Sequence, residues 1–234
     1  MDVRGRGAVV TGASRGLGRE LARVLAREGA KVAMVARDGA ALDAAVRAIR
    51  AEGGDAHAIP GDVGDKQGTY AIAGAAEALV GPVDLLVHAA STLGPLPMPL
   101  LMDTACEDLA AVLETNLIGA FRLTKALAGG MALRKSGTVV LVTSDAAVNG
   151  YPTWGAYGIS KAALDHLGRT WAAELTGRVA FLTVDPGEMD TKMHADAMPD
   201  ADRSTLASPA RVAEGIFRLL SAPFESGARV TVAS

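Results

Sequence analysis

The sequence is poor in several kinds of residue, and each scarcity excludes a class of protein. Its 234 residues include a single cysteine, Cys106, so a disulfide framework is excluded and a reducing compartment is expected. Aromatic residues make up only 4%, so a core has to be built from aliphatic side chains. Lysine and arginine do not outnumber the acids, and the net charge of −3 argues against a nucleic-acid partner.

Long apolar runs are also missing. No stretch approaches the roughly 20 residues that cross a bilayer, so no membrane partner is expected. The opening residues MDVRGRGAVVTG are charged and enter a short strand-like run, which is not the pattern of a signal peptide. His57, His166 and His194 have no carboxylate or cysteine at ligand spacing, so no metal site is predicted. These absences predict a soluble cytoplasmic protein with one domain, 1–234.

Short β-branched runs alternate with alanine-rich helical patterns along the whole chain. The strand candidates are 8–10, 31–36, 55–60, 83–89, 137–144, 178–185 and 228–233. The helix candidates are 16–29, 39–53, 65–80, 107–133, 153–176 and 209–221. Strands that are apolar on both faces indicate a parallel sheet covered by helices. The prediction is therefore an α/β fold, a doubly wound, Rossmann-type parallel sheet of about seven strands with helices on both faces.

Two irregular stretches follow strands, 91–101 and 188–209. Doubly wound sheets bind ligands at the carboxyl ends of their strands, near the point where the strand order reverses. Loops at that rim commonly carry function. Both stretches are therefore predicted to be substrate loops.

A glycine-rich turn, VVTGASRGLG, joins the first predicted strand to the first predicted helix. Gly12 permits a tight turn, and Gly16 and Gly18 let the backbone approach a pyrophosphate at the helix N-terminus. The spacing G-x-x-x-G-x-G differs from the G-x-G-x-x-G fingerprint, and such a turn taken alone is a weak signal. Its place between the first strand and the first helix favours a dinucleotide site.

The end of the second predicted strand indicates which dinucleotide binds. An NAD-preferring site places a carboxylate there, whereas this chain has Ala36 followed by Arg37. Arg15 stands in the glycine turn, and two guanidinium groups suit a 2′-phosphate. Asp38 is expected to cap the next helix, and the alternative for Arg37 is a solvated loop charge. The prediction is NADP(H).

The segment YGISK places Tyr157 and Lys161 four residues apart, on one face of a helix. A nearby ammonium favours the phenolate form of a tyrosine, so the pair suits proton transfer. This spacing also occurs by chance in many helices.

Together these segments resemble the short-chain dehydrogenase/reductase family over essentially the whole chain. TGASRGLG is similar to the family's phosphate-binding turn, and YGISK to its Tyr-x-x-x-Lys signature. The resemblance implies the catalytic residues Asn116, Ser144, Tyr157 and Lys161. It implies cofactor contacts by Gly12, Ser14, Arg15, Gly16, Leu17, Gly18, Arg37, Asp62, Val63, Ala89, Tyr157, Lys161, Pro186, Gly187, Met189 and Thr191.

Each catalytic residue receives an expected role from this resemblance and from the chemistry of hydride transfer. Tyr157 would be the acid in reduction and the base in oxidation, with its pKa lowered by Lys161. Lys161 would also hold the nicotinamide ribose. Ser144 would donate a hydrogen bond to the substrate oxygen, and Asn116 would position a water that relays protons.

Two departures from the family pattern have structural consequences. The family commonly has Asn-Asn-Ala-Gly where this chain has HAAS, 88–91. Ala89 replaces an asparagine that tethers the neighbouring backbone, so a looser rim is expected. The chain stops at ARVTVAS without the usual Val-Asp-Gly-Gly, which leaves open the interface that this ending often forms.

The leading prediction is an NADPH-dependent oxidoreductase that transfers a hydride between the nicotinamide and a carbonyl or secondary alcohol. One alternative is a reductase of 3-oxoacyl thioesters on an acyl carrier protein, for which Lys192 and Arg203 are scant support. Another is a non-catalytic protein that senses the dinucleotide, but such proteins usually lose the tyrosine or the lysine.

Apolar stripes on two predicted helices exceed what one sheet face needs. They comprise Leu113, Leu117, Phe121, Leu164, Leu167 and Trp171. In the family, the corresponding helices pair with their copies in a second subunit, so a homodimer or homotetramer is expected. The other expected partner is a small-molecule carbonyl or alcohol.

Overall fold

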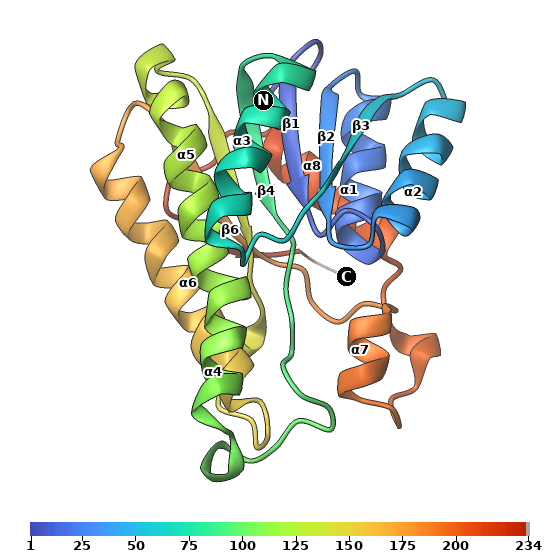
Figure 1. Ribbon diagram of the computed structural model, residues 1–234, viewed down its shortest axis with the longest axis vertical. Coiled ribbons are helices and arrows are strands. Elements are labelled where there is room, and N and C mark those ends of the chain that lie inside the picture. The colour runs from blue at the N-terminus through green and yellow to red at the C-terminus, as the bar shows by residue number, and fades with distance from the viewer. Residues whose placement is uncertain (233–234) are drawn as a thin grey trace.

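A seven-stranded parallel sheet organises the chain, of which the computed structural model describes residues 1–232 (Figure 1). The strand order is β3-β2-β1-β4-β5-β6-β7, and every neighbouring pair is parallel. The strands are β1 (Gly7–Thr11), β2 (Lys31–Ala36), β3 (Asp55–Pro60), β4 (Val83–His88), β5 (Thr138–Val142), β6 (Ala180–Asp185) and β7 (Arg229–Thr231). The order reverses between β1 and β4, which confirms the predicted doubly wound, Rossmann-type fold.

Helices cover both faces of the sheet, as its apolar strands require. They are α1 (Gly16–Arg27), α2 (Gly39–Ala51), α3 (Lys66–Val80), α4 (Cys106–Leu113), α5 (Gly119–Arg134), α6 (Gly155–Glu174), α7 (Lys192–Ala197) and α8 (Pro209–Ser221). Strand side chains alternate between two buried clusters. Val10 and Val32 pack with α1, α2 and α8, whereas Val9 and Ala33 pack with α3, α5 and α6. The core is therefore two aliphatic layers separated by the sheet.

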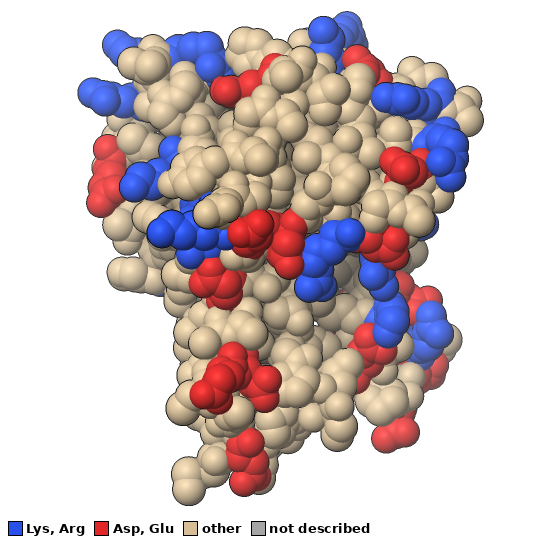
Figure 2. Space-filling model, viewed as in Figure 1, with Lys and Arg blue, Asp and Glu red and all other residues tan. Residues whose placement is uncertain are grey.

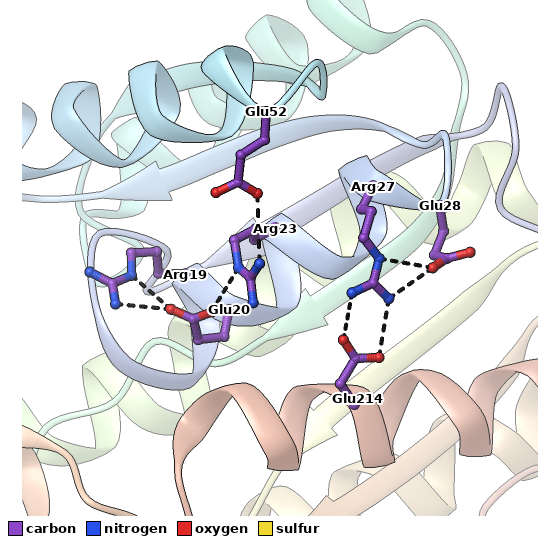
Figure 3. A network of polar contacts seen from close by, with 7 residues as sticks. All are labelled: Arg19, Glu20, Arg23, Arg27, Glu28, Glu52 and Glu214. Carbon is purple, nitrogen blue, oxygen red and sulfur yellow. Dashed lines mark hydrogen bonds and ion pairs between the residues drawn. The ribbon is translucent and has the colours of Figure 1, made fainter.

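Helix α1 is amphipathic, and its polar side fixes it to α8. Leu17, Leu21 and Val24 recur at a spacing of three or four residues and are buried. On the surface, the Arg27 guanidinium makes a bidentate contact with the Glu214 carboxylate of α8, at 2.6 and 3.1 Å (Figure 3). This guanidinium lowers the pKa of Glu214. The pair links two helices that pack through buried apolar residues and whose first turns border the same cleft.

Two predicted elements differ in the structure. The helix predicted over 107–133 is divided into α4 and α5 by a π-helical turn, Glu114–Ile118. The stretch predicted to be irregular over 188–209 contains α7 and a 3-10 turn, Arg203–Thr205. Helix α7 begins where the Thr191 hydroxyl accepts a hydrogen bond from a first-turn N–H, a cap that side-chain periodicity does not reveal.

The last strand is shorter than predicted. The prediction ran over 228–233, whereas β7 ends at Thr231, and residues 233–234 lie outside the described part of the chain. The extent of one domain over 1–234 stays a prediction. Among the described residues, no helix combines the length and apolar character that crossing a bilayer requires.

Candidate active site

A cleft of about 790 Å³ opens at the carboxyl ends of β1, β2 and β4, where the strand order reverses. In Figure 1 these strand ends point down, toward the region between α4 and α7. Its lining includes the glycine turn, the loops after β4 and β6, and one face of α6. This is the position at which doubly wound sheets bind nucleotides.

The glycine turn forms a cradle that side chains would fill. Gly12 has a φ of +67°, and a Cβ there would lie 2.8 Å from the Ala89 carbonyl oxygen. A Cβ on Gly18 would collide with the Gly12 carbonyl. Helix α1 starts after Arg15 without any side-chain cap, so its first N–H groups face the cleft unpaired by a side chain. This geometry fits a pyrophosphate.

The end of the cleft beside β2 carries the two arginines that the sequence singles out. The Arg37 side chain is 67% exposed, and its nearest carboxylate oxygen, on Asp62, is 3.9 Å away. Arg15 is exposed and makes no ion pair within residues 1–232. Asp38 caps α2 by accepting a hydrogen bond from the Ala41 N–H at 3.0 Å, as predicted. The donor set therefore fits a 2′-phosphate on the adenosine ribose.

A third arginine at the cleft is already paired with a carboxylate. Arg19 lines it, but its guanidinium is bound to the Glu20 carboxylate at 3.1 and 2.9 Å (Figure 3). Glu20 also accepts a hydrogen bond from Arg23 at 3.0 Å. This network separates Arg19 from the two arginines that remain available to an anion.

Tyr157 and Lys161 lie on one buried face of α6, at the opposite end of the cleft. The Lys161 Nζ is 5.4 Å from the centre of the Tyr157 ring and donates a hydrogen bond to the Val142 carbonyl at 2.8 Å. Burial lowers the pKa of Lys161 to about 8, although Asp165 opposes this shift. The lysine therefore stays mostly charged at neutral pH, beside the tyrosine.

The pKa of Tyr157 is raised, not lowered, by the protein groups around it. Burial raises it to about 12, and hydrogen bonds with Ser144 and Ser91 offset only part of that shift. The net shift is upward because the loss of hydration by the buried phenol outweighs the groups that favour its charged form. At neutral pH the phenol is therefore protonated.

Ser144 ends the segment after β5 and begins a 3-10 turn. Its hydroxyl accepts a hydrogen bond from the Ala146 N–H at 3.2 Å and donates one to Asp145 at 3.0 Å. Its carbonyl accepts a hydrogen bond from Arg229 of β7 at 3.0 Å. The serine is thus held from two sides, next to the phenol of Tyr157.

Asn116 lies in the π-helical turn and is fully engaged by protein groups. Its Oδ1 accepts hydrogen bonds from the Thr92 N–H at 2.8 Å and from the Ser91 hydroxyl at 3.2 Å. Its Nδ2 donates to the Thr92 carbonyl and to the Ser160 hydroxyl, both at 2.9 Å. An amide has two lone pairs and two N–H donors, so this side chain is saturated. A relay water, expected from the sequence, would have to bind another group.

The loop after β4 is held by a side chain of β1, a contact that the sequence did not reveal. The Thr11 hydroxyl accepts hydrogen bonds from the Ala89 and Ala90 N–H groups, at 3.2 and 3.1 Å. The looser rim expected from Ala89 is therefore countered at the backbone by a side chain of β1.

Most of the other predicted cofactor contacts border the cleft: Ser14, Gly16, Leu17, Val63, Pro186, Met189 and Thr191. Asn116 is buried behind it, and Ser144 and Gly187 are not part of its lining. The predicted substrate loops contribute Ser91, Thr92, Leu93, Met193 and Ser208 to the lining, although the sequence singled out none of these side chains, and Thr143 lines it from outside both loops. Their signal was their position directly after strands or at a helix start. Within the described residues, no three His, Cys, Asp or Glu side chains gather as a metal site would require.

The wall beside Tyr157 is apolar. Leu93 and Ala146 are buried against it, and Trp154 presents its ring edge to the phenol with the ring centres 5.7 Å apart. Met193, from α7, packs onto the same cluster. The Tyr157 end of the cleft therefore combines hydroxyl groups with an apolar surface.

Comparison with known proteins agrees with this geometry. The sequence profile of the short chain dehydrogenase family matches residues 6–202. A short chain dehydrogenase from Pseudocercospora fijiensis is 37% identical over 95% of this chain and 71% of its own length. A 3-oxoacyl-[acyl-carrier-protein] reductase from Synechocystis is 36% identical over 80% of this chain and 75% of its own length.

Solved structures are similar over nearly the whole chain. A 7α-hydroxysteroid dehydrogenase complexed with NADH and 7-oxo glycochenodeoxycholic acid has a TM-score of 0.89, 29% identity and coverage of 99% of this chain and 94% of its own. An actinorhodin polyketide ketoreductase with NADPH has a TM-score of 0.89, 28% identity and coverage of 97% and 95%. With the family profile matched over most of its length, this protein belongs to the short chain dehydrogenase family.

Proposed function

We propose that the protein is an NADP-dependent carbonyl reductase or alcohol dehydrogenase in which Tyr157 is the general acid and base. The observation that carries the proposal is one cleft with the glycine cradle at one end and the Tyr157–Lys161 pair at the other. A hydride donor bound along the cradle would reach a carbonyl placed against the phenol.

The cofactor supplies the hydride, and the protein's residues handle the proton. In reduction, the phenol of Tyr157 gives its proton to the carbonyl oxygen as negative charge develops there. A pKa of about 12 keeps that phenol protonated at neutral pH, so it is ready to act as the acid. Ser144 supplies a hydroxyl to the same oxygen, and removing one such donor typically reduces the rate on the order of a hundredfold.

Oxidation requires the opposite state of Tyr157, the phenolate. The charged Lys161, close to the ring, favours the phenolate, and so would the positive ring of an oxidised nicotinamide. The same pair therefore serves both directions. We place Asn116 in this centre as the group that fixes the loop after β4, and Thr191 and Met189 on the nicotinamide side of the cleft.

The preference for NADP rests on charge. Arg15 and Arg37 are exposed at the ribose end, and Ala36 stands where an NAD site would place a carboxylate. The related solved structures hold NADH in one case and NADPH in the other, so the fold accommodates both.

The test is consumption of NADPH and of NADH by the purified protein with ketones, aldehydes, diketones and 3-oxo thioesters. We expect turnover with NADPH, and at least a thousandfold loss in Tyr157→Phe with unchanged NADPH binding. Tyr70→Phe is the matched control, because Tyr70 is an exposed residue of α3. Equal activity in wild type and Tyr157→Phe would refute the assignment of the general acid.

The carrier-protein alternative is favoured by the Synechocystis relative and disfavoured by charge. Such a partner is acidic and needs free basic groups at the mouth, but Lys192 is bound to Asp196 at 2.6 Å and Arg203 to Asp190 at 2.6 Å. A small-molecule substrate is therefore the better proposal. With it we propose a cytoplasmic location and a homodimer or homotetramer.

A further inference from the structure

Ser91 occupies a place in the active site that neither the motifs nor the assigned roles explain. It follows β4 by three residues, is half-buried and lines the cleft beside Tyr157. Its hydroxyl donates to the Asn116 amide, and Leu93, two residues further along the same loop, packs in one cluster with Tyr157.

The hydrogen bonds of Asn116 determine which way the Ser91 hydroxyl points. The Thr92 N–H can only donate, so the amide atom that it contacts at 2.8 Å is the oxygen. Ser91 shares that oxygen at 3.2 Å and is therefore the donor in this contact. The longer distance makes it the weaker of the two bonds to Oδ1.

The Ser91 hydroxyl has only one proton, so it can serve only one acceptor at a time. When it leaves Asn116, the amide oxygen keeps the Thr92 N–H and is not left without a partner. A phenolate on Tyr157 is a charged acceptor, and hydrogen bonds to charged acceptors are shorter and stronger than neutral ones. Rotation of the hydroxyl toward the phenolate is therefore favourable once the charge appears.

We propose that Ser91 is a catalytic hydroxyl that turns from Asn116 to the phenolate of Tyr157 when the tyrosine gives up its proton. The step rests on the proposed reaction. The Tyr157 O–H bond breaks, its proton goes to the substrate oxygen, and the electron pair stays on the phenolate. Ser91 keeps its own proton and exchanges only its hydrogen-bond acceptor. It thus stabilises the charged form of the tyrosine, together with Ser144.

Two features of the site fit this role. The Ser91 hydroxyl is one of the two groups that lower the pKa of Tyr157, against the larger effect of burial. The carboxylates of Asp145 and Asp185 act in the opposite direction, so a nearby donor is needed to hold the phenolate.

The test compares Ser91→Ala, which removes the hydroxyl, with Ser91→Thr, which keeps it. In alcohol oxidation with NADP⁺, Ser91→Ala should raise the apparent pKa of the tyrosine limb by about one unit and lower kcat about tenfold below it. KM for NADP⁺ should stay within about twofold, because no cofactor role is assigned to this hydroxyl. Ser91→Thr should restore the wild-type profile. The control is Ser136→Ala, in the turn before β5, because Ser136 is not part of the cleft lining.

The outcome that overturns the proposal is an unchanged pH profile in Ser91→Ala, or equal impairment of Ser91→Thr and Ser91→Ala. A second readout does not need turnover: NMR titration of labelled tyrosine ring carbons in each variant with saturating NADP⁺, whose positive ring favours the phenolate, and with circular dichroism to establish folding. We expect Tyr157 to titrate higher in Ser91→Ala than in wild type. If the wild type reduces no carbonyl, the proposed reaction is wrong. The titration still tests, independently of turnover, whether Ser91 stabilises the phenolate of Tyr157.

Discussion

Burial determines the protonation of the ionisable residues around Lys161. It is the largest cause of a pKa of about 8 for Lys161, about 12 for Tyr157 and about 3 for His88. In each case the shift favours the neutral form, as expected when an ionisable group loses water. A neutral phenol is the form that a reductase needs, so the apolar surroundings of the site have a chemical consequence.

The lowered pKa of His88 makes the stability of the fold depend on pH. It is fully buried at the end of β4, and its Nε2 lies 2.9 Å from the Thr124 hydroxyl. Burial, with a smaller effect of Lys161, lowers the pKa of His88 from 6.5 to about 3. The unfolded chain therefore binds a proton that the folded chain refuses, and stability falls as the pH drops below 6.5.

We expect His88→Asn to reduce this loss of stability in acid. One such histidine removes about 2 kcal/mol between its usual pKa and about pH 5. Urea unfolding of wild type and variant across that range measures the free energy of unfolding at each pH. In acid this free energy should fall more steeply with decreasing pH in wild type, and near neutral pH the two slopes should be the same. His166→Asn, at an exposed position of α6, is the control and should follow wild type. Parallel curves for wild type and His88→Asn would contradict the expectation.

At the scale of elements, the positions of helices and strands followed from periodicity, whereas the interruptions did not. Helix α8 spans the predicted 209–221, and β2 and β3 also have their predicted bounds. The π-helical turn inside 107–133 was invisible because its cause lies far away in the sequence. Asn116 bonds to the loop after β4 and to Ser160 of α6, and Gly119 lies against the Val63 carbonyl, where a Cβ would lie 2.6 Å from the oxygen. Extra residues in a helical turn of this kind are frequent at functional sites.

In the candidate site too, some residues could be predicted from local spacing and others could not. Tyr157, Lys161 and the glycine turn could be predicted because their spacing within one element determines their geometry. Ser91 could not, because its role depends on two side chains from α6 and from the π-helical turn. The same reason hid the Thr11 hydroxyl, which acts across the sheet on the loop after β4.

Strand β7 contributes a partly buried cation to the site from the other end of the chain. Arg229 binds the Asp165 carboxylate at 3.0 Å, the Asp185 carboxylate at 3.0 Å and the Ser144 carbonyl at 3.0 Å. The two carboxylates are only 4% and 6% exposed, so each depends on this guanidinium. Through these contacts a short final strand fixes α6, the end of β6 and the backbone of Ser144.

We expect Arg229→Met to lower the free energy of unfolding by about 3–5 kcal/mol, because it leaves two carboxylates buried without their cation. Arg229→Lys should lose less, since it keeps the charge but not the forked geometry. Urea denaturation at neutral pH measures both. Arg178→Met, at an exposed position before β6, serves as the control. A loss below about 1 kcal/mol in Arg229→Met would mean that the carboxylates find other partners.

Across the whole molecule, charge and apolar surface are distributed unevenly. Figure 2 shows acidic and uncharged atoms, without basic ones, over the lobe of α4 and the loop before it. The acids there include Asp103, Glu107 and Asp108. An acidic carrier protein would be repelled from this lobe, whereas a neutral substrate would not. The surface thus favours the same class of substrate as the apolar wall beside Tyr157.

The apolar stripes that predicted a homo-oligomer are partly used inside the chain. Leu164 is fully buried, and Trp171 stacks between Phe121, with ring centres 6.0 Å apart, and Phe181, at 6.2 Å. The outermost ring, Phe121 of α5, remains 36% exposed. An aromatic side chain that is anchored on one face and open on the other suits a contact between copies of the chain.

We therefore expect Phe121→Glu to produce monomers while leaving the fold intact. A charge at this position would be desolvated without a partner in any interface that covers the ring. Sedimentation velocity should give a dimer or tetramer for wild type and a monomer for the variant, with unchanged circular dichroism. Tyr70→Glu, at an exposed position on α3, is the matched control and should sediment as wild type. If Phe121→Glu keeps the wild-type sedimentation coefficient, the subunits meet through another surface, and the stack on Trp171 serves only to cover the edge of the core.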